Sequence, residues 1–324
     1  MSFLAAISAM LLLTNSLQAA ALNDTLKNET LAIDDTLKQK VLDKVNNSKI
    51  SEQIVEQSGI ADKLDELLHI KYFQDYYFTT DTQELNIYGF DPDEIPEYHD
   101  SVYIDRIRTL NGETPIELTY NKTVKNYIEL YAVKKRDLTS RMLGMAEVYF
   151  PLFEEYLDRY DLPLELKYLA IVESALNPRA GSHAGAKGLW QFMYSTGKVY
   201  GLNVSSLIDE RYDPYQATDA ACRHMKDLYE IYGDWSLVMA AYNSGAGNVN
   251  KAIRRAGGLK NYWAIWPFLP RETRGYVPAF TAVTYVMNYA PEHNLYPVHP
   301  GILYNGIDTV IVNEPLAFDQ VSES

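Results

Sequence analysis

Helix start and stop signals in residues 121–290 constrain the fold of this 324-residue chain more than any other feature of its sequence. Asp213-Pro214-Tyr215-Gln216 combines a capping side chain, a proline at the first helical position and a glutamine, and the helix that it opens is expected to end at Gly233. Asp234 then caps a short apolar segment that closes at Gly245. Signals so closely spaced predict a mainly α domain with short connections.

The pattern changes on either side of this domain. Residues 22–120 hold short amphipathic stretches followed by a looser, tyrosine-rich segment, so we expect a helical and irregular N-terminal extension. Within the domain, further helices are expected over residues 164–176 and from about 271 to 289. Residues 291–324 are expected to be a C-terminal tail.

The first 21 residues have the pattern of a signal peptide. Phe3 to Leu13 form an apolar run, and Ala19-Ala20-Ala21 supplies small residues for cleavage. The run is shorter than the roughly 20 residues that a membrane span needs. The segment lacks Lys and Arg, which leaves a buried N-terminal helix as the alternative. No cysteine follows the run, so we expect an exported protein of the periplasm or cell envelope without a lipid anchor on cysteine.

Composition excludes several classes of protein. With 12% aromatic residues the chain is not disordered. Its net charge of −14 argues against nucleic-acid binding, because phosphate contacts need a positive surface. Cys222 is the one cysteine, and the six histidines are scattered, so we expect neither a metal site nor a cofactor.

Glu173 is the most informative single residue. It lies near the end of the predicted helix 164–176, which is apolar nearly all round and is therefore expected to be buried. Burial and the negative end of the helix dipole both disfavour ionisation, so the pKa of Glu173 is expected to rise. A carboxylic acid that keeps its proton near neutral pH can act as a general acid. Pairing with a buried Arg or Lys, or capping the next loop, is an equally good interpretation of the position.

Four further segments could contribute to a site, and each also has an ordinary structural interpretation. Residues 272–276 lie at the start of the last predicted helix, where Glu272 is also a favourable first-turn charge. Residues 177–188 form a glycine-containing loop that gives backbone access to a ligand, although plain connectors look the same. Residues 188–193 mix an indole, an amide and a thioether, which suits a sugar but is more often core. Residues 241–247 place a phenol and an amide at a helix end, which is also common C-cap chemistry.

Four motifs, in this order and spacing, resemble those of family 1 lytic transglycosylases, which are lysozyme-like enzymes of bacterial cell-wall turnover. The motifs are Glu173-Ser174, Gly188-Leu189-Trp190-Gln191, Ala241-Tyr242-Asn243 and Glu272-Thr273-Arg274-Gly275-Tyr276. The resemblance implies a lysozyme-like domain over residues 121–290, with Glu173 as the catalytic acid and base. Trp190 stands where the family often has Met, and we expect it to be a packing or stacking residue. The resemblance also implies that peptidoglycan glycan strands are the partner and that these residues line the cleft: Ser182, Gln191, Met193, Tyr242, Asn243, Glu272 and Tyr276.

The same resemblance implies the reaction of a carbon–oxygen lyase. Glu173 would protonate the oxygen between N-acetylmuramic acid and N-acetylglucosamine, and would then take the proton of the C6 hydroxyl, so that a 1,6-anhydro ring closes without water. Ordinary glycoside hydrolases use two carboxylates. The motifs after Glu173 supply a single further carboxylate, Glu272, which favours chemistry assisted by the substrate. A hydrolytic muramidase and a catalytically silent peptidoglycan-binding protein are the alternatives.

Overall fold

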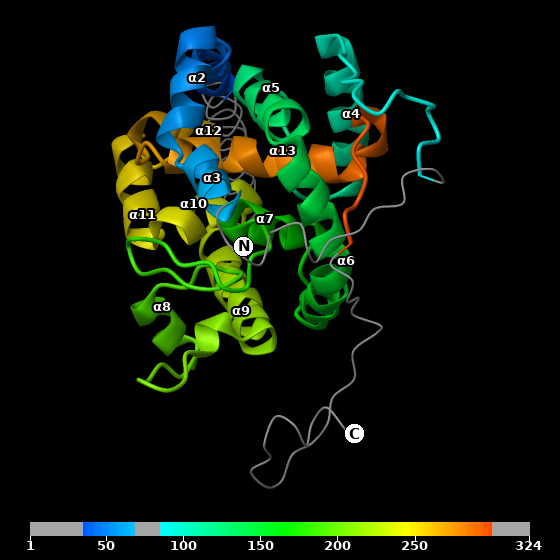
Figure 1. The fold of residues 1–324 in the computed structure, drawn as a ribbon. Helices are drawn as coiled ribbons and strands as arrows, with labels where there is room; N and C mark the ends of the chain where they lie inside the picture. Colours follow the sequence, from blue (N-terminus) through cyan, green and yellow to red (C-terminus); the bar gives the residue numbers. More distant parts are fainter. Residues whose placement is uncertain (1–34, 69–84, 300–324) are drawn as a thin grey trace, which may run out of the picture. The chain divides into compact units, whose positions relative to one another are not determined.

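The computed structural model describes residues 35–68 and 85–299, and this part of the chain is helical (Figure 1). It contains no strand, although isolated bridges join Gly181 to Lys187, Lys187 to Phe192 and Val204 to Asp209. The mainly α prediction is therefore confirmed. After a helix over residues 35–45, the α-helices are α2 (Ser48–Gln57), α3 (Ile60–Leu68), α4 (Asp100–Glu113), α5 (Lys122–Glu129), α6 (Arg136–Arg159), α7 (Leu169–Ser174), α8 (Tyr194–Val199), α9 (Pro214–Tyr232), α10 (Trp235–Ser244), α11 (Ala246–Arg255), α12 (Tyr262–Ile265) and α13 (Tyr276–Asn288).

The chain folds into two compact units, each built from separate stretches of sequence. In its described part, the first unit holds residues 35–62, 98–130 and 221–285. Within it, α10, α11 and α12 pack together, and α2 packs on α5. The fully buried aromatic side chains of this unit include Tyr127, Tyr262 and Phe280. This unit thus buries large rings among short helices.

In its described part, the second unit holds residues 63–68, 85–97, 131–220 and 286–299. Its longest helix, α6, packs on the 3-10 helix η4 (Leu164–Tyr168), and η4 packs on α7. The Trp190 side chain is fully buried, with its ring 4.9 Å from that of Phe153, and its indole N–H donates to Thr218 Oγ1 over 2.9 Å. Of the two roles that the sequence left open for Trp190, packing and stacking, the structure shows packing.

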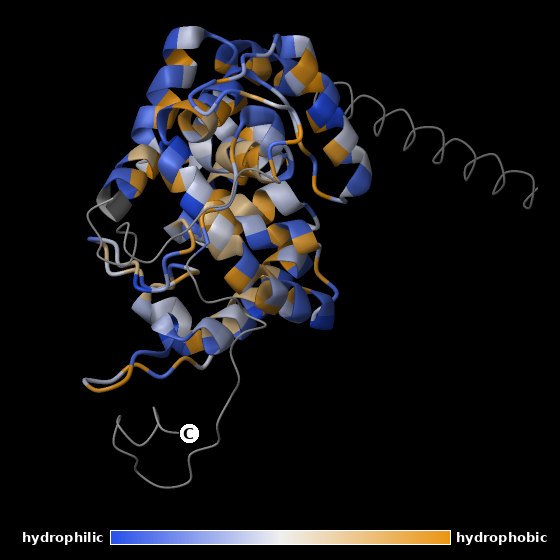
Figure 2. Cartoon of the chain, turned by 45° about the vertical axis from the view of Figure 1, so that its right-hand side comes forward, coloured by the Kyte–Doolittle hydropathy of each residue, from blue (hydrophilic) through white to orange (hydrophobic). Residues whose placement is uncertain are grey.

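The predicted cap residues explain where α9 and α10 begin. Asp213 Oδ1 accepts from the backbone N–H groups of Tyr215 and Gln216 at 2.8 and 2.9 Å, which caps α9. Asp234 Oδ1 accepts from Leu237 N–H at 2.7 Å at the start of α10. Hydrophobic and hydrophilic residues alternate along single helices, the amphipathic pattern expected of helices that cover a core (Figure 2).

Three expectations about helices need correction. Residues 164–176 are not one α-helix: η4 precedes α7, which ends at Ser174 because the next two residues are left-handed. The last helix begins at Tyr276 rather than near 271, since Pro278 has no N–H and fits only the first helical turn. The tyrosine-rich segment that was expected to be irregular contains α4, whose first turn is capped by the His99 side chain.

Two other expectations concern parts of the chain that are not described. The signal peptide over residues 1–21 and most of the tail over 291–324 lie outside the described residues. Within residues 35–68 and 85–299, no helix has both the length and the apolar character needed to cross a bilayer. The domain boundaries expected at 21, 120 and 290 stay predictions.

Candidate active site

Glu173 lies in the last turn of α7, in the second unit. Its side chain is 7% exposed, in a helix whose six residues are all buried. Lys63, from α3, places its ammonium nitrogen 4.0 Å from Glu173 Oε2, and that lysine side chain is 34% exposed. The next residue, Ser174, donates its hydroxyl to the carbonyl oxygens of Ala170 and Leu189 at 2.9 and 2.8 Å. A buried carboxyl with a half-buried cation beside it is thus held at the end of a short, tightly packed helix.

The backbone turns sharply after this carboxyl. Ala175 and Leu176 have φ angles of +48° and +60°, a left-handed conformation that costs energy for residues with a Cβ atom. Both side chains are buried, and Asn177 Oδ1 accepts from Arg179 N–H at 2.9 Å, which starts the following loop. Strain of this kind persists where the surrounding packing holds it, and it concentrates at functional sites.

Arg211 organises the loop that follows, residues 180–192. Its guanidinium donates to the carbonyl oxygens of Gly185 and Phe192 at 2.9 and 3.2 Å, and it binds both carboxylate oxygens of Asp209 at 2.9 and 2.6 Å. This ion pair raises the pKa of Arg211 and lowers that of Asp209. Gly188, with φ +77°, lies so close that a Cβ atom there would be 1.8 Å from the Arg211 carbonyl oxygen. One buried arginine and one glycine therefore hold the loop in shape.

The predicted cleft residues of the second unit have different environments. Met193 is 43% exposed and Ser182 is half-buried, with its Oγ accepting from Ala186 N–H at 3.0 Å. Gln191, with φ +49°, donates its amide to Ala180 O and Gly188 O at 3.3 and 2.8 Å. The structure thus uses the Gln191 amide nitrogen to fasten the loop, while Met193 is open to solvent.

The first unit holds the remaining predicted residues. Tyr242 and Asn243 are half-buried in the last turn of α10, and the Tyr242 ring lies 5.2 Å from the imidazole of His224. Burial lowers the pKa of His224 to about 4, against a weaker opposing effect of Asp227, so this imidazole is neutral at pH 7. Asn243 Oδ1 accepts from the Thr273 hydroxyl at 2.9 Å, which joins α10 to the fourth motif.

The fourth motif forms the 3-10 helix η7 (Thr273–Gly275) and the start of α13. Glu272, just before η7, is exposed, whereas Tyr276 is 3% exposed. Gly275 packs so closely that a Cβ atom would lie 2.4 Å from Tyr127 Oη. Arg274 donates to the carbonyl oxygens of Leu269 and Pro267 at 3.1 and 2.8 Å.

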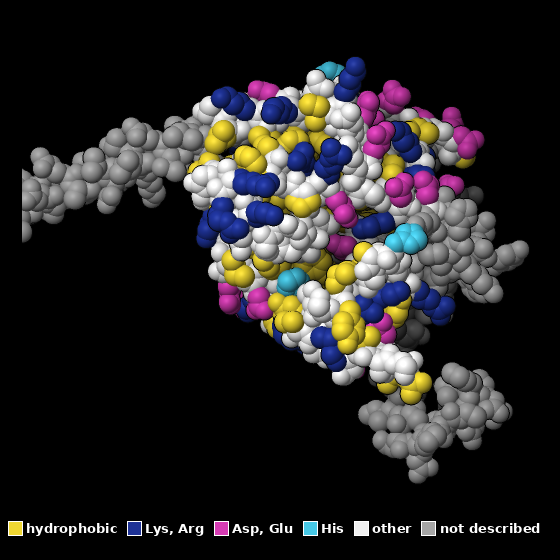
Figure 3. Space-filling model, turned by 90° about the vertical axis from the view of Figure 1, so that its left-hand side faces the viewer, with side chains coloured by type: hydrophobic (Ala, Val, Ile, Leu, Met, Phe, Trp, Pro, Cys, Tyr) yellow, Lys and Arg dark blue, Asp and Glu magenta, His cyan; other side chains and the backbone are white. Residues whose placement is uncertain are grey.

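Four of the predicted site residues therefore lie in each unit. The second unit holds Glu173, Ser182, Gln191 and Met193, and the first holds Tyr242, Asn243, Glu272 and Tyr276. Within the described residues, no group of three His, Cys, Asp or Glu could hold a metal ion. Both signs of charge and hydrophobic side chains occur on the face shown in Figure 3.

Sequence reasoning missed Lys63, Asp209 and Arg211. Lys63 comes from an amphipathic helix far from Glu173 in sequence, and no local pattern could have paired the two. For Asp209 and Arg211 a signal exists, because a charged pair two residues apart stands immediately before the helix cap at Asp213. Burial of Arg211 nevertheless depends on the loop that it binds, which is a tertiary contact.

Comparison with known proteins identifies relatives of part of the chain. Residues 151–265 match the family model of the transglycosylase SLT domain. Membrane-bound lytic murein transglycosylase D of Escherichia coli (strain K12) is 35% identical over 193 residues, which cover 57% of this chain and 41% of the relative. A protein named for tributyltin chloride resistance in Alteromonas sp. (strain M-1) is 33% identical over 125 residues, covering 38% of this chain and 60% of the relative.

The first of these relatives is longer than the matching region, and the chain spans about 41% of its length. Among solved structures, the 70-kDa soluble lytic transglycosylase of Escherichia coli has a TM-score of 0.40 and 26% identity, covering 52% of this chain and 28% of that chain. Because this TM-score is low, the similarity of residues 151–265 to the transglycosylase SLT domain rests on the sequence matches alone.

Proposed function

We propose that this chain, whose residues 151–265 match the family model of the transglycosylase SLT domain, is a peptidoglycan lytic transglycosylase of the bacterial cell envelope. The single observation that carries the proposal is the place of Glu173: a carboxyl that is 7% exposed, at the end of α7 and directly before the loop that Arg211 holds. Export by a signal peptide over residues 1–21 is part of the proposal.

Glu173 acts first as an acid and then as a base. It protonates the glycosidic oxygen between N-acetylmuramic acid and N-acetylglucosamine, and the muramyl N-acetyl group assists the cationic centre. The carboxylate then accepts the C6 hydroxyl proton while the C6 oxygen closes the 1,6-anhydro ring. The glycosidic bond breaks, one C–O bond forms, and no water is consumed, so the atoms balance with one carboxyl group.

Burial and the neighbouring Lys63 act on the protonation of Glu173 in opposite directions. Burial favours the protonated form that the first step needs. The Lys63 ammonium, 4.0 Å away, favours the carboxylate and suits the second step, in which a base is needed. At 4.0 Å the lysine acts through charge rather than through a hydrogen bond. The same group can therefore serve in both steps.

The other residues of the four motifs would bind the glycan strand. Met193 offers an exposed thioether surface to a sugar face, and the Ser182 hydroxyl and the Gln191 amide oxygen are available to hydroxyl and N-acetyl groups. Tyr242, Asn243, Glu272 and Tyr276 are the other residues that we propose to bind the strand. Gln191 has a second role, since its amide nitrogen fastens the loop.

The test is digestion of purified peptidoglycan by wild-type protein and by Glu173→Gln, with products identified by mass spectrometry. We expect wild type to release anhydro products, lighter by one water than hydrolytic products, and Glu173→Gln to lose at least about 10²-fold in rate, as for removal of a general acid. The matched control is Glu155→Gln, an exposed glutamate of α6 that pairs with Arg159. Circular dichroism and urea unfolding verify that each variant is folded.

The outcomes separate the proposal from its alternatives. Products of hydrolytic mass from wild type would indicate a muramidase. Binding to peptidoglycan without any product would indicate a silent binding protein. Unchanged activity of a folded Glu173→Gln variant would contradict the role of Glu173.

A further inference from the structure

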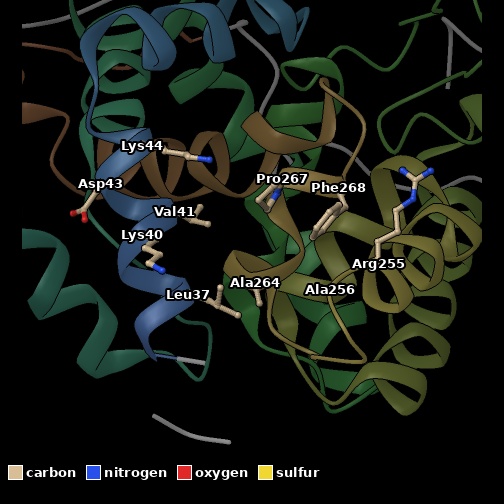
Figure 4. A pocket seen from close by; sticks show the side chains of 10 residues that line it. All are labelled: Leu37, Lys40, Val41, Asp43, Lys44, Arg255, Ala256, Ala264, Pro267 and Phe268. Atoms are coloured by element: carbon tan, nitrogen blue, oxygen red, sulfur yellow. The ribbon is translucent and has the colours of Figure 1, made fainter. Parts of the chain in front are cut away.

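The first unit contains a pocket that none of the four motifs contributes to. Its volume is about 500 Å³, within the range of small-molecule sites. One wall is the helix over residues 35–45, and the other is formed by the end of α11, by α12 and by the 3-10 helix η6 (Trp266–Phe268), as Figure 4 shows. The lining residues are Leu37, Lys40, Val41, Asp43, Lys44, Arg255, Ala256, Ala264, Pro267 and Phe268.

The floor of the pocket is apolar. Leu37 and Val41 extend from the helix toward the opposite wall, where Ala264 and Phe268 lie (Figure 4). Phe268 is 40% exposed, so its ring is accessible to a ligand in the pocket. This floor would accept methyl groups and short aliphatic chains.

The side chains that line the pocket carry a net positive charge, whereas the net charge of the whole chain is negative. Lysine and arginine number 29 against 43 acidic residues in the chain, yet the pocket is lined by Lys40, Lys44 and Arg255 and by one acid, Asp43. Asp43 already accepts from the Gln39 amide at 2.9 Å. Among the described residues, none of the three cations forms an ion pair within 4.0 Å, so their charge is available to an anionic ligand.

We propose that this pocket binds a short acidic peptide with small apolar side chains, its carboxylates on Lys40, Lys44 and Arg255 and its methyl groups on the floor. An arginine suits a carboxylate because its guanidinium can make two parallel hydrogen bonds, and lysines add charge. The stem peptides of peptidoglycan have this chemistry, and their choice as ligand rests on the proposed function. A lipid surface fits less well, because Leu37 and Val41 turn into a hollow instead of projecting outward.

The direct test is calorimetric titration of the full chain with synthetic L-alanyl-γ-D-glutamyl-meso-diaminopimelyl-D-alanine. We expect saturable binding that weakens with salt, and about a tenfold loss of affinity in the double variant Lys44→Glu/Arg255→Glu. The matched control is Lys49→Glu, an exposed lysine of α2 outside the pocket, which should bind as wild type does. Phe268→Ser tests the floor without changing charge and should weaken binding to a smaller extent.

Several results would overturn the inference. These are absence of saturable binding, equal loss in Lys49→Glu, or no loss in the charge-reversal variant. Binding to phosphatidylglycerol vesicles, abolished by charge reversal and without peptide binding, would assign the pocket to a lipid surface instead. Activity separates this inference from the proposed function: the charge-reversal variant should digest glycan strands stripped of peptide as wild type does. Peptide binding by a wild-type protein without lytic activity would remove the proposed function and leave the pocket.

Discussion

In each unit an arginine donates hydrogen bonds to backbone carbonyl groups of a segment that carries predicted site residues or lies next to them. The two arginines differ in their other partners. Arg211 of the second unit has the Asp209 carboxylate as well as two carbonyl oxygens, and its side chain is 7% exposed. Arg274 of the first unit donates to two carbonyl oxygens and, in the described part of the chain, has no carboxylate within 4.0 Å. Burial accordingly lowers the pKa of Arg274, whereas the Asp209 ion pair raises that of Arg211.

The difference follows from what each arginine holds. Arg211 binds a loop without repeating structure, in which Gly188 and Gln191 have positive φ angles. Arg274 belongs to the η7 helix and binds the turn before it, where 3-10 hydrogen bonds already order the backbone. A loop that lacks its own hydrogen-bond ladder depends more on side chains. The segment next to Glu173 should therefore be the more sensitive of the two to substitution.

The largest effect is expected from Arg211→Met. The change leaves Asp209 and two carbonyl oxygens without their donor. Breaking a fully buried ion pair costs about 3–5 kcal/mol, and because the Asp209 side chain is 21% exposed the cost here should lie at the lower end of that range. Urea unfolding measures this cost. The matched control is Arg108→Met, because the Arg108–Asp105 pair is about 70% exposed and should matter by less than about 1 kcal/mol. Equal effects of the two substitutions would contradict the special role of Arg211.

Gly188→Ala should cost about 3 kcal/mol, since the new methyl group would meet the Arg211 carbonyl oxygen and the backbone would keep a positive φ angle. Gly185→Ala separates the two causes: its φ is +90°, but no atom lies within 4 Å of its would-be Cβ. That control should lose about 1 kcal/mol, from backbone strain alone. Both free energies come from urea unfolding, and a Gly185→Ala loss as large as that of Gly188→Ala would exclude the clash as the cause.

Arg274→Met should destabilise the protein by about 2 kcal/mol, through two lost hydrogen bonds to carbonyl groups. No carboxylate partner is stranded by this change, so the loss should be smaller than that of Arg211→Met measured in the same urea experiment. The order of these two losses of unfolding free energy tests whether the Arg211 loop depends more on its arginine than the Arg274 turn does. A larger loss for Arg274→Met would contradict this.

The smallest effect concerns the pH dependence of stability through His224. Its folded-state pKa of about 4 is below the ordinary value of 6.5, so the unfolded chain binds this proton more readily. The neutral His224 imidazole therefore contributes to the free energy of unfolding above pH 6.5. This contribution, about 1–2 kcal/mol for a half-buried group, is lost as the pH falls toward 4. His224→Gln should flatten the slope of unfolding free energy against pH in this window. An unchanged slope would show that His224 does not titrate as described.

Sequence alone determined the helical class, the caps at Asp213 and Asp234 and the four motifs that resemble those of lytic transglycosylases. These properties are local, because a helix cap or an apolar periodicity is formed by residues that are close together in the sequence. They can therefore be recognised from the sequence itself. Even the burial of Glu173 follows from the apolar residues on all sides of its own helix.

The tertiary structure decided what surrounds that glutamate. The position of Lys63 beside it, the ion pair of Arg211 and Asp209 beneath the loop, and the end of α7 at two left-handed residues all depend on packing between distant segments. Conformational strain and buried charge are tolerated only where many neighbours act together, and no short stretch of sequence contains those neighbours.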